Sequence, residues 1–317
     1  MIKVGVVGLG MMGQHHVRVY SQLGCELVGV ADANIKRAKE IGEKYGVSFY
    51  SDYTKLKPQV DAVSIVVPTR LHQQIAVDFI KQGVHCLVEK PIASNLDEAE
   101  EIIRAAEANH INLMVGHIER FNPAVLRLKQ LIHQGILGKL MIISTRRVGP
   151  FVPRIRDVGI IIDTATHDID VTRYLVGKEP VSVFSKAGRF KHPKEDYAIV
   201  VLDFGDATAS IEVNWFTPSK VRSLVATGSE GIAYLDYIKQ ELTVHNSQHI
   251  NTIRIEKTEP LKSELEHFLS CAETGKTPLV DGYEGLKVLK IALEASNQPC
   301  ENNIDASKHL VTGGVNV

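Results

Sequence analysis

From Lys3 to Met114 the chain alternates short apolar runs with longer amphipathic stretches. The apolar runs are continuous rather than alternating, which is typical of parallel strands covered on both faces. The amphipathic stretches have the period of helices that pack against such a sheet. The expected strands are KVGVVG, CELVGVAD, DAVSIVVP, HCLVEKP and INLMVGH, and the expected helices span residues 14–23, 36–45, 71–81 and 96–108.

After Asn122-Pro123 this rhythm ends, and from about Lys139 strands predominate. The segment ATASIEVNWF alternates apolar and polar residues and follows AIVVLDF across a Gly205-Asp206 turn. Such a pattern predicts an antiparallel hairpin with one buried face and one more polar face. Further helices are expected at residues 163–175, 261–274 and 283–296.

The two halves together predict an α/β fold class. We expect an N-terminal Rossmann doubly wound parallel sheet, residues 1–120, followed by an α+β domain with a large, mainly antiparallel sheet, residues 121–317. Whether the C-terminal segment packs back on the first domain stays open. A length of 317 residues agrees with two domains. The half-polar face of the second sheet is equally suited to face solvent or to form a homo-oligomer interface.

Composition and charge exclude several function classes. With 23% charged residues and a formal net charge of −1, the chain has no electrostatic basis for nucleic acid or an anionic membrane as its main partner. No run of ~18 apolar residues is present, and no signal-peptide pattern surrounds the first expected strand, which starts at Ile2. We therefore expect a cytoplasmic protein.

The histidines and cysteines do not predict a metal site. The four cysteines are far apart and form no Cys-x-x-Cys pair. His245 and His249 have a ligand-like spacing but lie in a polar stretch typical of a turn, and the adjacent His15 and His16 would point to different sides of a helix. We expect no metal.

A glycine motif marks the first strand end as a dinucleotide site. The sequence Gly8-Leu9-Gly10-Met11-Met12-Gly13 fits Gly-x-Gly-x-x-Gly between an expected strand and an expected helix. The glycines allow a tight turn, close approach of the pyrophosphate and close packing of helix and strand. The expected cofactor-binding residues here are Gly8, Gly10, Met11, Met12 and Gly13.

An acid at the end of the second strand favours NAD over NADP. Asp32 lies 22 residues beyond Gly10, where a carboxylate binds the ribose 2′-hydroxyl and repels a 2′-phosphate. Lys36 and Arg37 lie close in sequence and soften this preference. We expect Arg37 to bind the cofactor as well.

The next two expected strands also end in polar residues. Ligands of open α/β sheets bind at the carboxyl ends of the strands. The residues that we expect to line the cofactor crevice there are Pro68, Thr69, His72, Glu89 and Lys90.

Four motifs in this order, Gly-x-Gly-x-x-Gly, Pro-Thr-x-x-His, Glu-Lys-Pro and Asp163-x-x-x-His167-Asp168, closely resemble the glucose-fructose oxidoreductase and inositol dehydrogenase (Gfo/Idh/MocA) family. The resemblance covers nearly the whole chain. It implies that Lys90, Asp163 and His167 meet at the carbinol of the substrate as catalytic residues, and that the protein is a homodimer or homotetramer.

The chemistry of these residues agrees with that implication. Asp163 and His167 are four residues apart and share a face if the segment is helical. His167 is the preferred base for the hydroxyl proton. Lys90 is expected to stabilise the developing alkoxide, or to act as the base if desolvated, and Asp163 to orient Lys90 or the sugar. On spacing alone, a helix N-cap and a structural histidine are equally good interpretations of the pair.

A group of arginines precedes the expected catalytic helix and suggests an anionic substrate, since guanidinium groups suit diphosphates. The surrounding segment resembles the branch of the family that oxidises UDP-N-acetylglucosamine at C3. We also expect Arg120 and Asn122, at the junction of the halves, to shape the cleft, although Asn122 could simply cap the following helix. The four arginines of the group, which we expect to bind the substrate together with Arg120 and Asn122, are Arg146, Arg147, Arg154 and Arg156.

The leading hypothesis is therefore an NAD-dependent dehydrogenase acting on a sugar nucleotide. A dehydrogenase of a free polyol, cyclitol or hexose is the first alternative, and the arginine group distinguishes between the two. A non-catalytic NAD-binding sensor is the second alternative, because a fold does not by itself determine function.

Overall fold

A computed structural model describes residues 1–151, 158–298 and 300–301. The chain divides into two compact units. The first unit consists of Met1–Leu126 and Glu256–Lys290, and the second of Arg127–Ile255 and the residues from Ile291 on. The domain boundary that the sequence predicts at residue 120 stays a prediction.

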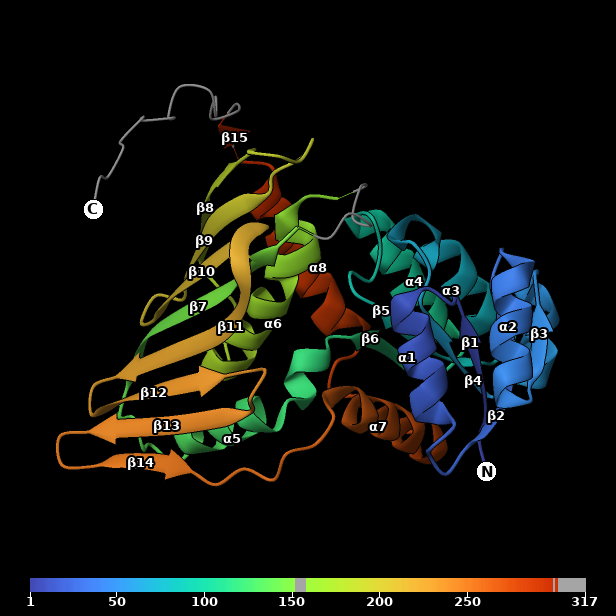
Figure 1. Ribbon diagram of the computed structural model, residues 1–317, viewed down its shortest axis with the longest axis horizontal. Helices are drawn as coiled ribbons and strands as arrows, with labels where there is room; N and C mark the ends of the chain where they lie inside the picture. Colours follow the sequence, from blue (N-terminus) through green and yellow to red (C-terminus); the bar gives the residue numbers. More distant parts are fainter. Residues whose placement is uncertain (152–157, 299, 302–317) are drawn as a thin grey trace, which may run out of the picture. The chain divides into compact units, whose positions relative to one another are not determined.

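The first unit is built on a six-stranded parallel sheet of order β3-β2-β1-β4-β5-β6 (Figure 1). This is the doubly wound order, in which the direction of winding reverses between β1 and β4. Strand β4 inside the sheet and strand β6 at its edge are both buried along their whole length, as their apolar runs predict. The strands are β1 (Lys3–Val7), β2 (Glu26–Ala31), β3 (Ser48–Tyr50), β4 (Ala62–Ile65), β5 (His85–Glu89) and β6 (Leu113–Gly116).

Helices connect these strands, and α3 packs with α4 while α7 packs against α1. The later segment of the unit also reaches the sheet itself, since the Val115 N–H donates to the carbonyl of Val280 at 2.9 Å. The helices are α1 (Met11–Tyr20), α2 (Ile35–Tyr45), α3 (His72–Ile80), α4 (Leu96–Ala108), α7 (Pro260–Thr274) and the first part of α8 (Gly282–Ser296), with 3₁₀ turns η1 (Tyr53–Lys55), η2 (Lys57–Gln59), η3 (Thr69–Leu71) and η4 (Ile118–Phe121).

The second unit contains a nine-stranded sheet of order β14-β13-β12-β11-β7-β10-β9-β8-β15. All neighbouring strands are antiparallel except β7 with β10 and β8 with β15. The strands are β7 (Leu140–Pro150), β8 (Ser182–Gly188), β9 (Tyr197–Asp203), β10 (Thr208–Asn214), β11 (Phe216–Gly228), β12 (Gly231–Asp236), β13 (Glu241–Asn246), β14 (Ile250–Ile253) and β15 (Cys300–Glu301).

One face of this sheet carries α6 (Thr166–Val176), which follows a wide helical turn, η5 (Ile161–Ala165). In Figure 1, α6 and α5 (Pro123–His133) lie on one side of the sheet. The expected hairpin is present as β9 and β10, and Ala209, Ile211 and Val213 are buried. The predicted fold class, a Rossmann sheet followed by a large, mainly antiparallel sheet, is confirmed. Among the helices that the structure describes, none combines the length and the apolar character that a membrane span needs.

Candidate active site

The glycine motif forms the turn between β1 and α1. Gly8 has φ of +91°, which favours glycine. A Cβ on Gly13 would lie 1.9 Å from the Gly8 carbonyl oxygen, so helix and turn pack too closely for a side chain. Nothing lies within 4 Å of the position a Cβ would take on Gly10. The turn thus leaves open space beside Gly10, next to the N-terminus of α1 and to the exposed Met11.

Asp32, just after β2, is bonded to this turn. Its Oδ2 accepts a hydrogen bond from the Leu9 N–H at 2.8 Å, and its Oδ1 accepts one from the Asn34 N–H at 2.8 Å. The guanidinium of Arg37 lies 3.3 Å from Oδ2. The carboxylate is therefore held at the edge of the turn, and a cation that could meet a phosphate lies beside it.

The strand end after β4 places Pro68 and Thr69 at the start of η3, and His72 immediately after it. His72 is buried, with Nδ1 2.9 Å from the Pro91 carbonyl oxygen and Nε2 2.9 Å from the Val67 carbonyl oxygen. Burial lowers the pKa of His72. His72 thus connects the strand ends after β4 and β5, and its contact with the cofactor stays a prediction.

Glu89 ends β5, and Lys90 follows it with a cis bond to Pro91. One Glu89 oxygen, Oε1, lies 3.1 Å from Nε2 of His16, and the other accepts from the Lys90 N–H at 3.1 Å. Burial by itself would raise the pKa of Glu89, but the hydrogen bond and charge of His16, together with Lys90, hold that pKa below its ordinary value. Glu89 is therefore a carboxylate, and it fixes the main chain at Lys90.

In the second unit, Asp163 lies in η5 and His167 in the first turn of α6. Both side chains are half-buried. The Trp215 indole donates to the Thr164 hydroxyl at 3.3 Å, and this hydroxyl lies 3.1 Å from Oδ2 of Asp163. The expected helix is present, and its first turn is widened, a distortion found frequently at functional sites.

The arginine group does not stay together. Arg147 is buried and donates to Asp168 through Nε at 2.5 Å and Nη2 at 3.3 Å, while its guanidinium stacks on the ring of Tyr237. Arg146 is exposed and pairs with Glu212. The two arginines are consecutive in β7 and so point to opposite faces of the sheet. Arg154 and Arg156 lie outside the described residues.

Arg120 and Asn122 are internal to the first unit. Arg120 is buried, and its guanidinium donates to Glu284 at 2.6 Å. The side-chain oxygen of Asn122 accepts from the Ala124 N–H at 3.1 Å, so Asn122 caps α5. The cap that the sequence offered for Asn122 is therefore present, and its contact with a substrate stays a prediction.

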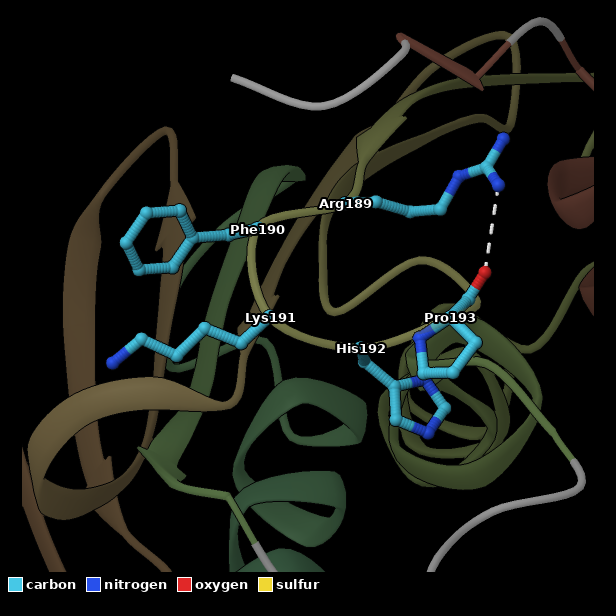
Figure 2. Close-up of a pocket in the computed structure, with 5 residues that line it drawn as sticks. All are labelled: Arg189, Phe190, Lys191, His192 and Pro193. Atoms are coloured by element: carbon cyan, nitrogen blue, oxygen red, sulfur yellow. Dashed lines mark hydrogen bonds between the residues drawn. The ribbon is translucent and has the colours of Figure 1, made fainter. Parts of the chain in front are cut away.

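A cationic loop that the sequence analysis did not single out adjoins the Asp163 segment. It connects β8 to β9, and an open pocket of about 430 Å³ is lined by its residues 189–193. Figure 2 shows Arg189 reaching toward the Pro193 carbonyl, while Phe190 and Lys191 point to the other side of the loop. The loop is tied to the segment before Asp163 because the Ile160 N–H donates to the Glu195 carbonyl at 2.9 Å.

Comparison with known proteins agrees with this arrangement. A family model described as "Oxidoreductase family, NAD-binding Rossmann fold" matches residues 2–117, and one described as "GFO/IDH/MocA C-terminal domain" matches residues 125–234. UDP-N-acetylglucosamine 3-dehydrogenase of Acidithiobacillus ferrooxidans is 30% identical over 304 residues, with 92% of this chain and 96% of that protein covered.

The chain belongs to the Gfo/Idh/MocA oxidoreductase family. A second relative, scyllo-inositol 2-dehydrogenase (NAD(+)) of Bacillus subtilis, is 29% identical over 320 residues, with 93% of each chain covered. A solved structure of the Acidithiobacillus enzyme superposes with a TM-score of 0.87 at 30% identity, over 93% of this chain and 96% of that one.

Membership confirms the predicted enzyme class and cofactor: this family member is an NAD-dependent oxidoreductase of the sugar and polyol type. The residues after β1 fit NAD, since Gly10 leaves room for a pyrophosphate at the start of α1 and Asp32 offers a carboxylate beside it. The roles of individual site residues stay predictions. In the described parts of the chain, no group of three or more His, Cys, Asp or Glu residues is arranged to hold a metal ion.

Proposed function

We propose that this oxidoreductase oxidises a secondary alcohol of a sugar, most specifically the C3 hydroxyl of UDP-N-acetylglucosamine. The observation that carries the proposal is the placement of Asp163 in η5 and of His167 in the first turn of α6, with Asp163 supported by Thr164 and Trp215. The match to a UDP-N-acetylglucosamine 3-dehydrogenase over nearly its whole length supports the choice of substrate.

Each proposed catalytic residue has one task. NAD, when bound, supplies the hydride acceptor. His167 takes the hydroxyl proton as the C–H bond of the carbinol breaks, because a neutral imidazole is a suitable base near neutral pH. Lys90 stabilises the negative charge that develops on the oxygen, and Asp163 orients Lys90 or the sugar. The balanced products are a 3-keto sugar nucleotide, NADH and a proton.

The cationic loop supports a sugar nucleotide. Arg189 and Lys191 line the open pocket, and the loop is bonded to the segment that leads into Asp163. A diphosphate is an anion that such side chains attract. Arg146 and Arg147 offer less support than their sequence suggests, since each is already paired with a carboxylate.

A free polyol, cyclitol or hexose is the second candidate substrate. The match to scyllo-inositol 2-dehydrogenase favours it, because this relative is nearly as similar and covers as much of the chain. Hydride transfer would use the same three residues with either substrate, so the choice depends on what binds the rest of the molecule.

The deciding experiment follows NADH absorbance with purified protein, NAD and, separately, UDP-N-acetylglucosamine, UDP-glucose, glucose, myo-inositol and scyllo-inositol. Absorbance that grows with UDP-N-acetylglucosamine, and not with the free compounds, is the expected result. Growth with a free sugar or inositol only would replace the sugar-nucleotide assignment. The Lys90→Ala variant tests the mechanism, and we expect its turnover to be lower by about 100- to 1,000-fold. A fully active Lys90→Ala enzyme would contradict the mechanism.

A further inference from the structure

His16 is a buried histidine to which the proposed reaction assigns no role. It lies in α1, the helix that follows the glycine turn, and its side chain has no exposed surface. Its Nδ1 has no hydrogen-bond partner among the residues that the structure describes. Leaving a buried polar atom unsatisfied costs about 1–3 kcal/mol, so an apolar side chain would serve better at this position if packing were its only purpose.

The other ring nitrogen of His16 reaches a residue far away in the sequence. Nε2 lies 3.1 Å from Oε1 of Glu89, which ends β5 and whose side chain is only 12% exposed. Because Glu89 is ionised, Nε2 is the donor in this bond. The second oxygen of the same carboxylate accepts from the Lys90 N–H at 3.1 Å. A single carboxyl group thus joins α1 to the peptide unit of Lys90.

The surroundings of this carboxylate restrict its movement. A Cβ on Gly116, in the neighbouring strand β6, would lie only 3.1 Å from the Glu89 carboxyl group. The ring of Tyr20 meets the ring of His16 edge-on, with centroids 6.4 Å apart, and the Tyr20 hydroxyl lies 2.8 Å from Ser64 Oγ. Close packing on these sides leaves the His16–Glu89 bond as the element that sets the carboxylate's orientation.

We propose that His16 is a positioning residue for Lys90. It orients the Glu89 carboxylate, and this carboxylate holds the main chain from which the Lys90 side chain extends toward the reacting alcohol. The inference rests on the proposed function for the task of Lys90. It adds that α1, the helix expected to bind the cofactor at its N-terminus, also determines the position of the Lys90 side chain.

Two amide substitutions separate positioning from general packing. Gln places its amide nitrogen near the position of histidine Nε2 and can still donate to Glu89, whereas Asn carries the same group but is too short to reach it. His15, exposed on the same helix, provides the matched control His15→Asn. The comparison between His16→Gln and His16→Asn therefore holds the polar group constant and differs by one methylene, which determines whether the amide reaches Glu89.

The first measurement is hydrogen exchange at the Lys90 amide, followed by mass spectrometry or NMR, which requires no substrate. We expect exchange about tenfold faster or more in His16→Asn, equivalent to roughly 1.4 kcal/mol, and near-native exchange in His16→Gln and His15→Asn. Equal protection of this amide in all variants would overturn the proposal, whatever the substrate proves to be.

The second measurement is turnover with the alcohol that the wild-type protein oxidises. A misplacement of ~1 Å costs about 100-fold, so we expect kcat to fall about 10- to 100-fold in His16→Asn with NADH affinity nearly unchanged, and to be largely restored in His16→Gln. Combined with Lys90→Ala, His16→Asn should cause no further loss. Additive losses, or a loss of NADH affinity alone, would contradict positioning. If the wild-type protein oxidises none of the alcohols, this result counts against the proposed function, and the hydrogen-exchange result alone decides the role of His16.

Discussion

At the scale of single residues, two glycines of the nucleotide turn meet different constraints. A Cβ on Gly13 would collide with the Gly8 carbonyl oxygen, whereas the space beside Gly10 is open and its backbone, with φ of −60°, is accessible to any residue. The first constraint belongs to the fold and the second to the cofactor. Substitution should therefore separate stability from binding.

We expect Gly13→Ala to cost about 1–3 kcal/mol of stability, because helix and turn must move apart. Gly10→Ala should unfold at the wild-type temperature but bind NADH at least about tenfold more weakly, since the new methyl group occupies space that the pyrophosphate needs. Thermal unfolding and a fluorescence titration with NADH measure the two effects. A Gly10→Ala protein with wild-type affinity would show that the pyrophosphate does not approach this residue.

At the scale of elements, the start of α6 is anchored to β7 through a buried ion pair. Asp168 follows His167 directly and binds Arg147, and the Tyr237 hydroxyl lies 3.4 Å from the same carboxylate. On the other face of β7, the exposed Arg146 pairs with the half-exposed Glu212. One strand thus provides two acid–arginine pairs that differ mainly in burial.

Removing one acid from each pair tests what burial contributes. We expect Asp168→Asn to lower stability by about 3–5 kcal/mol, since it leaves a buried guanidinium without this countercharge. The same change in the exposed pair, Glu212→Gln, should cost about 0–1 kcal/mol. Chemical denaturation of both variants provides the comparison, and similar losses would mean that the buried pair does not anchor α6.

The sequence predicts most of the secondary structure but few of the contacts between side chains. The periodicity predicts most strands and helices, including α4 at its observed bounds, because an element with one or two buried faces has a regular spacing of apolar residues along its sequence. It missed the short edge strand β3, and it read Arg146 and Arg147 as one group although a strand turns consecutive side chains to opposite faces. His16 was considered only as a metal ligand, yet Gly13, His16, Val17 and Tyr20 have the spacing of a buried helical face.

The sequence predicts the chemistry of the candidate site but not the contacts that its residues make. The strand-end rule and the motifs pointed to Lys90, Asp163 and His167. Neither could show that Arg120 donates to Glu284, or that Trp215 donates to Thr164 beside Asp163, because each of these two hydrogen bonds joins residues far apart in the chain.

At the scale of the whole molecule, burial shifts the pKa values of histidines in the first unit and of one glutamate in the second unit in opposite directions. In the first unit, burial lowers the pKa values of His72, His85 and His267. In two of them a ring nitrogen accepts a backbone N–H, from Asn112 to His85 Nδ1 and from Leu279 to His267 Nε2, and a protonated nitrogen cannot accept. In the second unit, burial raises the pKa of Glu195 instead.

The sign of each contribution follows from proton binding. Below about pH 6.5 the unfolded chain protonates these histidines while the folded unit does not, so the stability of the first unit falls as pH decreases toward the lowered pKa values. Glu195 acts in the opposite direction, because the folded state keeps a proton that the unfolded chain loses above about pH 4.3. Lowering the pH should therefore weaken the first unit more than the second.

We accordingly expect calorimetry to show the unfolding of the first unit moving to lower temperature between about pH 8 and about pH 5.5, ahead of the second. His85→Asn tests the cause, since its amide oxygen can accept the Asn112 N–H without titrating in this range. The acid loss should be shallower in this variant, and His110→Asn, in the same unit but on an exposed turn, should leave it unchanged. A first unit that gains stability on acidification, or a variant with an unaltered slope, would mean that the buried neutral rings do not govern the response.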